Sequence, residues 1–371
     1  MSASTYRPAP VHLVGSFPAP DATTALCKCA TALKGRLGSI PDGEPGWRWN
    51  FTIGLVQKKA TENPALAQIW REYDENYDPV PVKEMAGEEV ARLRAAIEQA
   101  SWELGYAEDA VASYAVFCKL RDEGAVEAGV RFQVCLPGVS SFAIFVKPAF
   151  QYLVEDLAYQ AMLRETEAIV AAIPPGDLAV QFDIASDYIK NEAQQDPSSS
   201  YLASLREDFH PPPDEDAMER YSAQYAGLMA KVPAAAFAGL HVCMGNINNK
   251  PVLAPRDMSV MVKLANRIVD KTTRQIQWIH FGCLAEWTDP TPYAPLAALH
   301  DKNLAVYLGL VYPDDLDGAK QRVAAAKNHL RQFGVAPVCG LARTSEDGVQ
   351  SVLNILKELT PTPTEEATGL V

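Results

Sequence analysis

The amino-acid sequence predicts an α/β fold, a single (β/α)8 TIM barrel whose active site lies at the carboxyl ends of the strands. Short apolar, β-branched segments alternate with longer stretches of helical periodicity, and the alternation occurs eight times. The short segments are almost continuously apolar, which is typical of a parallel sheet buried on both faces. Eight such units close naturally into a barrel. An open doubly wound sheet is the alternative, but no G-x-G-x-x-G fingerprint follows any early segment.

The predicted elements follow one another in strand–helix order. The eight predicted strands are residues 11–14, 37–40, 131–136, 178–182, 237–242, 276–279, 304–310 and 335–338. The predicted helices outside the insertion are residues 22–34, 149–172, 218–231, 258–269, 293–300, 318–332 and 347–359.

The chain length indicates insertions, because 371 residues exceed the roughly 250 of a bare barrel. We expect one domain over residues 1–359, with an insertion of about residues 42–128 after the second strand. The strongest helical periodicity of the insertion covers residues 87–106. Residues 194–216 are polar and predict a loop, and residues 360–371 predict a disordered tail.

Composition and charge disfavour several classes of function. The formal net charge is −13, and an acidic surface repels nucleic-acid phosphates and anionic membranes. No apolar stretch reaches the roughly 18 residues of a membrane span. The cysteines number seven, and the N-terminal residues lack the pattern of a secretion signal, so we expect free thiols or metal ligands in a reducing, cytoplasmic setting. The expected partner is a small-molecule substrate, and a homo-oligomer is compatible with the sequence.

Chemistry in such a barrel resides just past the strand ends, and the sharpest pattern there is His241-x-Cys243. Residues i and i+2 of a strand point the same way, so an imidazole and a thiol would face the barrel mouth together, as zinc prefers. Cys339, after the eighth predicted strand, would be a third ligand, and His280 or Cys283 a fourth. The alternative is that the cysteines are small buried residues and His241 is a hydrogen-bonded core histidine.

Carboxylates follow two other predicted strands. Asp183 ends an apolar strand, where a carboxylate is costly unless it is paired or lies at a wet site. The Asp42-Gly43-Glu44 turn is either only a polar turn or a site for a cationic or hydroxyl group of a substrate. We expect Glu44, Asp183 and His280 to be catalytic residues.

Further polar and aromatic residues stand near the predicted strand ends. Trp47 and Trp49 flank Arg48, and they either cover an aromatic or pterin-like ligand or pack the insertion onto the barrel rim. The expected substrate-binding residues are Ser16, Asp42, Glu44, Trp47, Arg48, Asp183, Asn246, Tyr312 and Arg343.

Three motifs together resemble the catalytic barrel of cobalamin-independent methionine synthase, a family that shares its fold with uroporphyrinogen decarboxylase. Val-Gly-Ser-Phe-Pro at residues 14–18 resembles the family's Ile-Gly-Ser-Phe-Pro. His-Val-Cys at 241–243 resembles its His-x-Cys zinc motif, and Val-Cys-Gly-Leu at 338–341 its Asp-Cys-Gly-Leu zinc motif. Two weaker likenesses are Asp-Gly-Glu at 42–44 with His-Gly-Glu, and Gln-Phe-Asp at 181–183 with Gln-Ile-Asp.

The resemblance implies a divergent zinc-dependent methyl or alkyl transferase. Zinc (Zn²⁺) would be held by His241, Cys243 and Cys339, and it would bind a small thiol as the thiolate that attacks an electrophilic methyl group. The family's fourth ligand is a glutamate at the end of the sixth strand, where this chain has none and His280 is the nearest candidate.

The resemblance also implies how the substrates are held. Ser16, Glu44 and Asp183 would bind the amino-acid part of the thiol substrate, and the methyl donor would be of the folate type. The chain lacks the family's long N-terminal barrel, which helps to bind polyglutamyl folate, so we expect another thiol or another small molecule as substrate.

Two other functions stay open on the sequence. A metal-free lyase or decarboxylase of the uroporphyrinogen decarboxylase kind would bind an acidic substrate through Asp42, Arg48, Asp183 and Arg343, and would stabilise a developing charge. A barrel that has lost catalysis would bind a small molecule without turnover.

Overall fold

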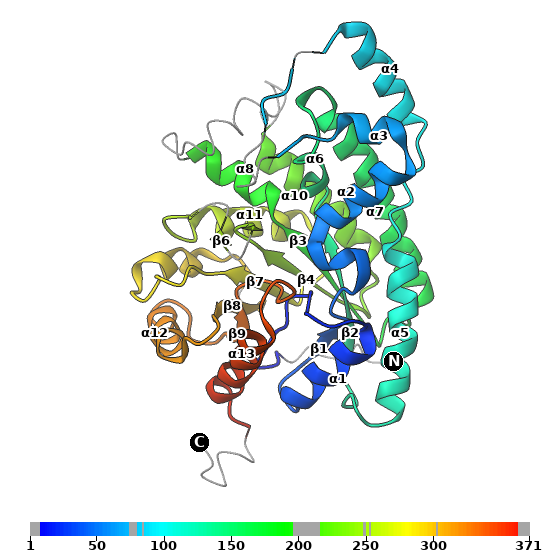
Figure 1. The fold of residues 1–371 in the computed structure, drawn as a ribbon. Helices are drawn as coiled ribbons and strands as arrows, with labels where there is room; N and C mark the ends of the chain where they lie inside the picture. The colour runs from blue at the N-terminus through cyan, green and yellow to red at the C-terminus, as the bar shows by residue number, and fades with distance from the viewer. Residues whose placement is uncertain are drawn as a thin grey trace.

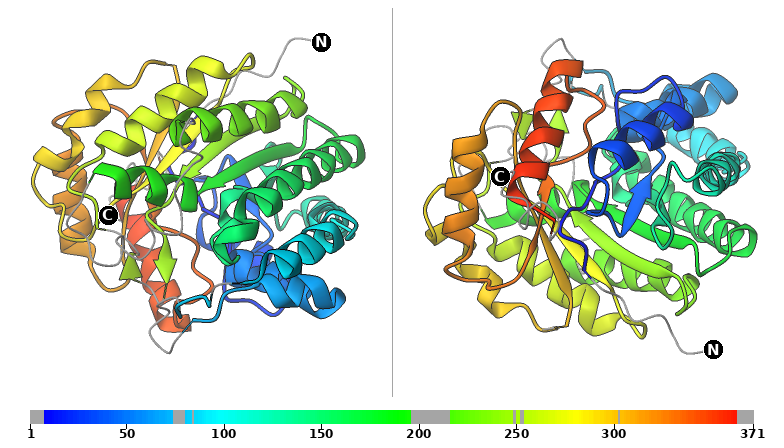
Figure 2. Two further views of the ribbon diagram at one scale, coloured as in Figure 1. Left: turned by 90° about the horizontal axis from the view of Figure 1, so that it is seen from above. Right: turned by 90° about the horizontal axis from the view of Figure 1, so that it is seen from below.

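The computed structural model describes residues 8–73, 80–83, 85–195, 216–247, 250–251, 254–301 and 303–362. Seven strands in this part of the chain form one curled, all-parallel sheet in the order β1-β2-β3-β4-β7-β8-β9, with helices around its outside (Figure 1, Figure 2). The strands are β1 Ser39–Pro41, β2 Arg131–Pro137, β3 Leu178–Ile184, β4 Phe237–Val242, β7 Trp278–Gly282, β8 Ala305–Val311 and β9 Gly334–Pro337.

The first predicted strand, residues 11–14, is not a strand of this sheet, whereas the other seven are confirmed. Val11 makes isolated parallel bridges to Leu37, just before β1, and to Val335 in β9. The backbone N–H of His12 donates to the carbonyl of Val335 at 3.1 Å. The chain at residue 11 therefore bridges the two edges of the curled sheet.

Side-chain amides take the place of strand hydrogen bonds beyond Val11. Nε2 of Gln133 in β2 donates to the carbonyl of Leu13 at 2.9 Å. Nε2 of Gln181 in β3 donates to the carbonyl of Val14 at 2.6 Å. Because these two carbonyls are satisfied by glutamines, residues 13–14 need no ladder partner, and the predicted strand shrinks to a bridge.

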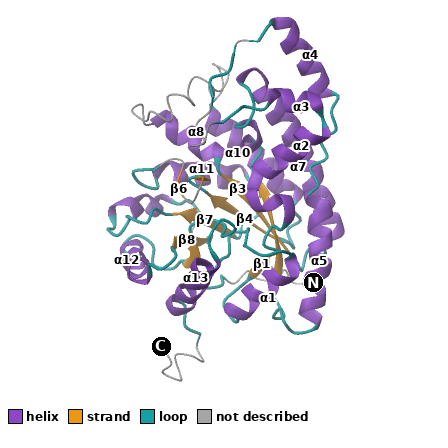
Figure 3. Ribbon diagram, viewed as in Figure 1, coloured by secondary structure: helices purple, strands orange, loops and turns teal. Residues whose placement is uncertain are grey.

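Helices form the outer layer, as the colouring by secondary structure in Figure 3 shows. They are α1 Ala22–Ala32, η1 Gly46–Asn50, α2 Phe51–Glu62, α3 Pro64–Ile69, α4 Gly87–Glu98, α5 Tyr106–Asp122, α6 Ser140–Ala143, η2 Pro148–Phe150, α7 Gln151–Ala172, α8 Ser186–Gln195, α10 Ala217–Lys231, α11 Ser259–Lys271, η3 Thr291–Ala298, α12 Leu316–Ala326 and α13 Glu346–Leu359. A short antiparallel pair, β5 Asn246–Ile247 and β6 Lys250–Pro251, follows β4 and was not expected.

The predicted insertion helix 87–106 is wrong in extent, because α4 ends at Glu98 and α5 begins at Tyr106. Gly105, just before α5, has a φ of 92°, which a helix interior excludes. The carboxylate of Glu165 in α7 accepts hydrogen bonds from the backbone N–H groups of Leu104, Gly105 and Ala107 at 2.7 to 2.9 Å. These bonds satisfy free N–H groups at the start of α5 and tie the insertion to α7.

The predicted loop 194–216 and tail 360–371 lie for the most part outside the described residues. Among the helices that are described, none combines the length and the apolar character that crossing a membrane would require.

A single indole fills the amino-terminal part of the sheet interior. Gly239 of β4 stands in register with Trp278 of β7. A Cβ atom added at residue 239 would lie 2.0 Å from Cε2 of the Trp278 ring. Only a glycine leaves room for this fully buried ring, so the pairing of β4 with β7 depends on it.

We expect Gly239→Ala to lower the free energy of unfolding by about 1–3 kcal/mol or more, because the new methyl group must displace the Trp278 ring. Gly176→Ala is the matched control, since no heavy atom lies within 4 Å of a Cβ added there. Urea unfolding followed by tryptophan fluorescence measures both. Equal stability of the two variants would contradict the described packing.

Candidate metal centre and its cavity

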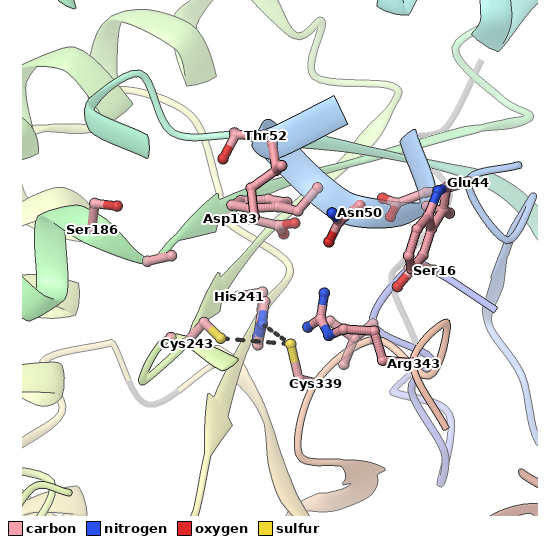
Figure 4. Close-up of a pocket in the computed structure, with 18 of the residues that line it drawn as sticks. Ser16, Glu44, Asn50, Thr52, Asp183, Ser186, His241, Cys243, Cys339 and Arg343 are labelled. Carbon is pink, nitrogen blue, oxygen red and sulfur yellow. Dashed lines mark hydrogen bonds between the residues drawn. The ribbon is translucent and has the colours of Figure 1, made fainter. Parts of the chain in front are cut away.

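A cavity of about 500 Å³ opens at the carboxyl ends of the strands. Its size suits a small-molecule site. The expected site residues that line it are Ser16, Glu44, Asp183, His241, Cys243, Cys339 and Arg343 (Figure 4). The cavity therefore lies where a barrel of parallel strands places its chemistry.

Three side chains meet on one side of the cavity. His241 lies in β4, Cys243 directly follows that strand, and Cys339 follows β9. Sγ of Cys243 is 3.6 Å from Sγ of Cys339, which is 3.9 Å from Nε2 of His241. All three ligand atoms lie within 4.8 Å of one another. The structure thus brings together residues almost a hundred positions apart, as the sequence motifs predicted.

The donor set and its spacing fit a zinc ion. In a tetrahedral site with Zn–S near ~2.3 Å and Zn–N near ~2.1 Å, neighbouring ligand atoms stand about 3.6–3.8 Å apart. The observed sulfur–sulfur separation of 3.6 Å and sulfur–nitrogen separation of 3.9 Å are close to these edges, and the remaining separation, between Cys243 and His241, is no more than 4.8 Å. Two thiols and an imidazole are also the soft and borderline ligands that zinc prefers.

The two thiols of the cluster differ in acidity. The hydrogen bond from Cys243 lowers the pKa of the Cys339 thiol well below its usual value, and His241 and Arg343 lower it further against the opposing effect of burial. The same hydrogen bond, together with burial, raises the pKa of Cys243. Of the two thiols, Cys339 is therefore the one whose thiolate form the surroundings favour, and a bound divalent cation would favour the thiolate form of both.

His280 does not join the three expected ligands, which corrects its assignment as fourth ligand. Its ring is fully buried in β7, and its Nδ1 lies 2.6 Å from Nδ1 of His241, on the side of that ring away from the sulfurs. The reason is the register, since His280 pairs directly with His241 one strand away. Cys283 is also absent from the cluster, because its Sγ faces the carbonyl of Phe281.

His280 also does not line the cavity, so its expected role as a catalytic residue in contact with substrate has no support in the geometry. Burial lowers its pKa well below the usual value, and the neighbouring His241 and His12 lower it further. His280 is therefore a neutral imidazole behind the cluster.

Two carboxyl groups face the cavity from the opposite wall. Nε2 of Gln181 donates to Oδ1 of Asp183 at 2.8 Å, which fixes that carboxyl group at the end of β3. Burial raises the pKa of Asp183 well above its usual range, and the charge of Glu44 adds to the effect. Burial likewise raises the pKa of Glu44 to about 8 against the opposing charge of Arg48. At neutral pH Glu44 favours the protonated form, and the same burial disfavours a charge on Asp183 until a cation or a hydrogen-bond donor binds beside it.

The backbone beside Glu44 is strained. Glu44 has a φ of 54° and Phe51 a φ of 52°, a left-handed conformation that side chains other than glycine rarely adopt. Oδ1 of Asp42 accepts the N–H of Glu44 at 2.9 Å and holds the turn. Both residues line the cavity, and such strain concentrates at functional sites.

Asp42 and Arg48 bind each other rather than line the cavity. Nη2 of Arg48 donates to Oδ2 of Asp42 at 2.7 Å, and Nε of Arg48 donates to Asp109 at 3.0 Å. The two buried charges neutralise one another and anchor η1 to β1 and α5. Their predicted role as direct substrate ligands is therefore not met in this structure.

Two further expected binding residues, Trp47 and Tyr312, lie away from the cavity lining. Trp47 packs edge-on against Tyr106, with ring centroids 5.1 Å apart, which is a contact within the predicted insertion. The hydroxyl group of Tyr312 donates to the carbonyl of Cys283. The backbone of Asn246 lies in β5, and its side chain is outside the described part of the structure.

One wall of the cavity is apolar and consists of Trp49, Phe51 and Ile53 of the insertion with Phe145 after α6. Of these, only Trp49 was considered from the sequence, as a residue that covers a ligand or packs the insertion. The position of Phe51 and Ile53 shortly after the Asp-Gly-Glu turn was the only available signal for those two. Nothing in the sequence pointed to Phe145, because the loop after β2 carries no polar pattern.

The raised pKa of Glu44 predicts a pH-dependent stability. The stability contributed by its neutral carboxyl group is fully present below about pH 4.5 and is lost as the pH rises through about 8. Glu44→Gln cannot ionise, so the wild type is expected to lose up to ~1.4 kcal/mol per pH unit relative to the variant across this window. Urea unfolding of the two metal-free proteins at stepped pH measures the difference. Parallel pH profiles would rule out a buried, proton-bearing Glu44.

No protein-family model matches the chain, and no curated protein matches it in sequence. Among solved structures, a B12-independent methionine synthase from a Shewanella species, in complex with selenomethionine, aligns with 72% of this chain and 68% of its own at 13% identity and a TM-score of 0.46. A protein described as a vitamin-B12-independent methionine synthase from Listeria monocytogenes aligns with 92% of this chain and 87% of its own at 14% identity and a TM-score of 0.48. Both descriptions name the family that the sequence motifs resemble. At this identity the likeness assigns no residue role to this chain.

Proposed function

We propose that the protein is a zinc-dependent methyl or alkyl transferase that acts on a small thiol. The observation that carries this proposal is the convergence of His241, Cys243 and Cys339, whose ligand atoms lie within 4.8 Å of one another beside a cavity of small-molecule size. We also propose that Val11, which bridges both edges of the sheet, marks the position of the eighth strand of a closed (β/α)8 barrel.

Three protein ligands suit a catalytic rather than a structural metal site. Structural zinc sites are closed by four side chains, whereas catalytic sites have three and an open position. Here the three ligands border the cavity, and the described residues supply no fourth. When bound, zinc lowers the pKa of a substrate thiol and so keeps it a nucleophile at neutral pH.

The polar and apolar walls of the cavity have different roles in this proposal. Ser16, Glu44, Asp183 and Arg343 form the polar wall, where Glu44 and Asp183 bind donors of the substrate and the guanidinium group of Arg343 binds an acidic group. In Figure 4 the guanidinium group of Arg343 points into the cavity close to Cys339. The apolar side chains Trp49, Phe51 and Phe145 form the outer wall, which keeps water from the nucleophile and accommodates the alkyl group.

The lyase alternative fits the geometry less well. It needs Asp42 and Arg48 to face an acidic substrate, and these two residues are committed to a buried ion pair with each other. Of its four residues, only Asp183 and Arg343 line the cavity.

The first test is the metal content of the purified protein. We expect zinc in stoichiometric amount after dialysis, and its loss in His241→Ala, Cys243→Ser and Cys339→Ser, because each change removes a ligand. Cys27→Ser is the control, since Cys27 lies in α1 outside the cluster. Inductively coupled plasma mass spectrometry gives the content. Wild-type protein that stays metal-free after incubation with zinc would overturn the proposal.

The second test concerns the acidic group of the thiol. In the cobalt-substituted protein we expect Arg343→Met to weaken binding of 3-mercaptopropionate by about tenfold, because a charge-assisted hydrogen bond contributes roughly 1.5 kcal/mol or more. Binding of the uncharged 2-mercaptoethanol is expected to change little, and Arg343→Lys to retain part of the preference. Absorbance titration of the cobalt–thiolate bands measures each Kd. An equal effect on both thiols would remove Arg343 from substrate recognition.

A further inference from the structure

A second histidine stands directly behind the proposed metal ligand His241. His241 in β4 and His280 in β7 are register partners in adjacent parallel strands. Register partners point to the same side of a sheet, so both rings face the interior. Their centroids are 4.7 Å apart with an interplanar angle of 41°. The two imidazoles are thus in contact because of the strand pairing.

The two rings are joined by a hydrogen bond whose donor and acceptor can be assigned if His241 holds a metal. Nδ1 of His280 is 2.6 Å from Nδ1 of His241, so one nitrogen donates a proton and the other accepts it. Nε2 of His241 points the other way, toward Sγ of Cys339 at 3.9 Å. If Nε2 of His241 is the atom that holds a metal, its Nδ1 must carry the proton, and His280 must be the acceptor.

Burial of His280 favours a neutral imidazole, and with Nδ1 as the acceptor its remaining proton lies on the buried Nε2. Its side chain is fully buried, and an imidazolium ion there would need a counter-charge. Its neighbours are the rings of His241 and His12, and it pairs in register with Tyr307 of β8. A Cβ atom at Gly309 would come within 3.2 Å of Nε2 of His280, so a glycine in β8 leaves the space that this ring occupies.

We propose that His280 is a positioning residue for the metal centre, which accepts the Nδ1 proton of His241 and thereby directs Nε2 of His241 to the two sulfurs. The inference rests on the proposed zinc site and adds a residue that contacts neither metal nor substrate. Metal-ligating histidines commonly donate their second nitrogen to a carboxylate or a carbonyl group. Here a buried neutral imidazole takes that place.

Two substitutions at residue 280 separate hydrogen bonding from packing. His280→Leu fills a similar volume and offers no acceptor. His280→Asn keeps an acceptor, because Oδ1 of asparagine stands at about the same distance from Cβ as Nδ1 of histidine. We expect His280→Leu to weaken zinc affinity by about 10- to 100-fold and His280→Asn to restore most of it. Competition with a chromogenic chelator gives the affinities.

A matched control and a spectrum complete the experiment. His300→Leu removes another imidazole, which bonds to Asp270 at the surface and not to a metal ligand, and is expected to leave zinc affinity unchanged. In the cobalt-substituted protein, His280→Leu is expected to shift the ligand-field bands, because His241 loses its fixed orientation. Thermal unfolding of each metal-free variant reports whether the fold is retained.

The outcomes distinguish this inference from the proposed function. Wild-type protein that binds neither zinc nor cobalt would overturn both. Wild-type protein that binds metal, with His280→Leu equal to it in affinity and spectrum, would overturn only the role of His280. Equal weakening in the Leu and Asn variants would show that the ring acts through packing, and this too would contradict the proposal.

Discussion

The site depends on the parallel register of three neighbouring strands. In the sheet, Asp183 of β3 pairs with His241 of β4, and His241 pairs with His280 of β7. A carboxyl group, a candidate metal ligand and its hydrogen-bond partner therefore form one row across the inner face of the curled sheet. A slip of one residue in any of these strands would turn a side chain of this row to the other face.

The row is held by contacts below and beside it. Gly239 and Trp278, two residues earlier in β4 and β7, interlock in the amino-terminal half of the interior. Gln181, two residues before Asp183, links the carbonyl of Val14 to the Asp183 carboxyl group and accepts a hydrogen bond from His12. Below the polar groups of the site lies a buried layer whose amide and imidazole groups form hydrogen bonds with one another. Buried polar atoms require such partners.

Much of the curled sheet and of the candidate metal cluster could be predicted from the sequence because both follow from short-range patterns. Apolar β-branched segments identified seven of the sheet strands, and the spacing of His241 and Cys243 put two ligands on one face of a strand end. The strand at residues 11–14 was overestimated, because the side-chain amides that take up its carbonyl groups come from residues more than a hundred positions away. The periodicity of a short segment does not reveal such distant hydrogen-bond partners.

The same limit explains the misplaced site residues. Asp42 and Arg48 looked like free charges beside a cavity, but their partners are each other and Asp109 in α5. The sequence placed His280 near the cluster but predicted it to be a metal ligand. Only the register shows that its Nδ1 contacts Nδ1 of His241 instead. Phe51 and Phe145 line the cavity because of how the insertion and the loop after β2 fold, which no motif in the sequence describes.

The most direct measurement is an anomalous-difference map recorded at the zinc absorption edge from crystals of the zinc-loaded protein. The account predicts a single strong peak at the cavity wall, about 2.3 Å from the sulfurs of Cys243 and Cys339 and about 2.1 Å from Nε2 of His241. A map without a peak there, or with Cys339 turned away from the other two ligands, would contradict it.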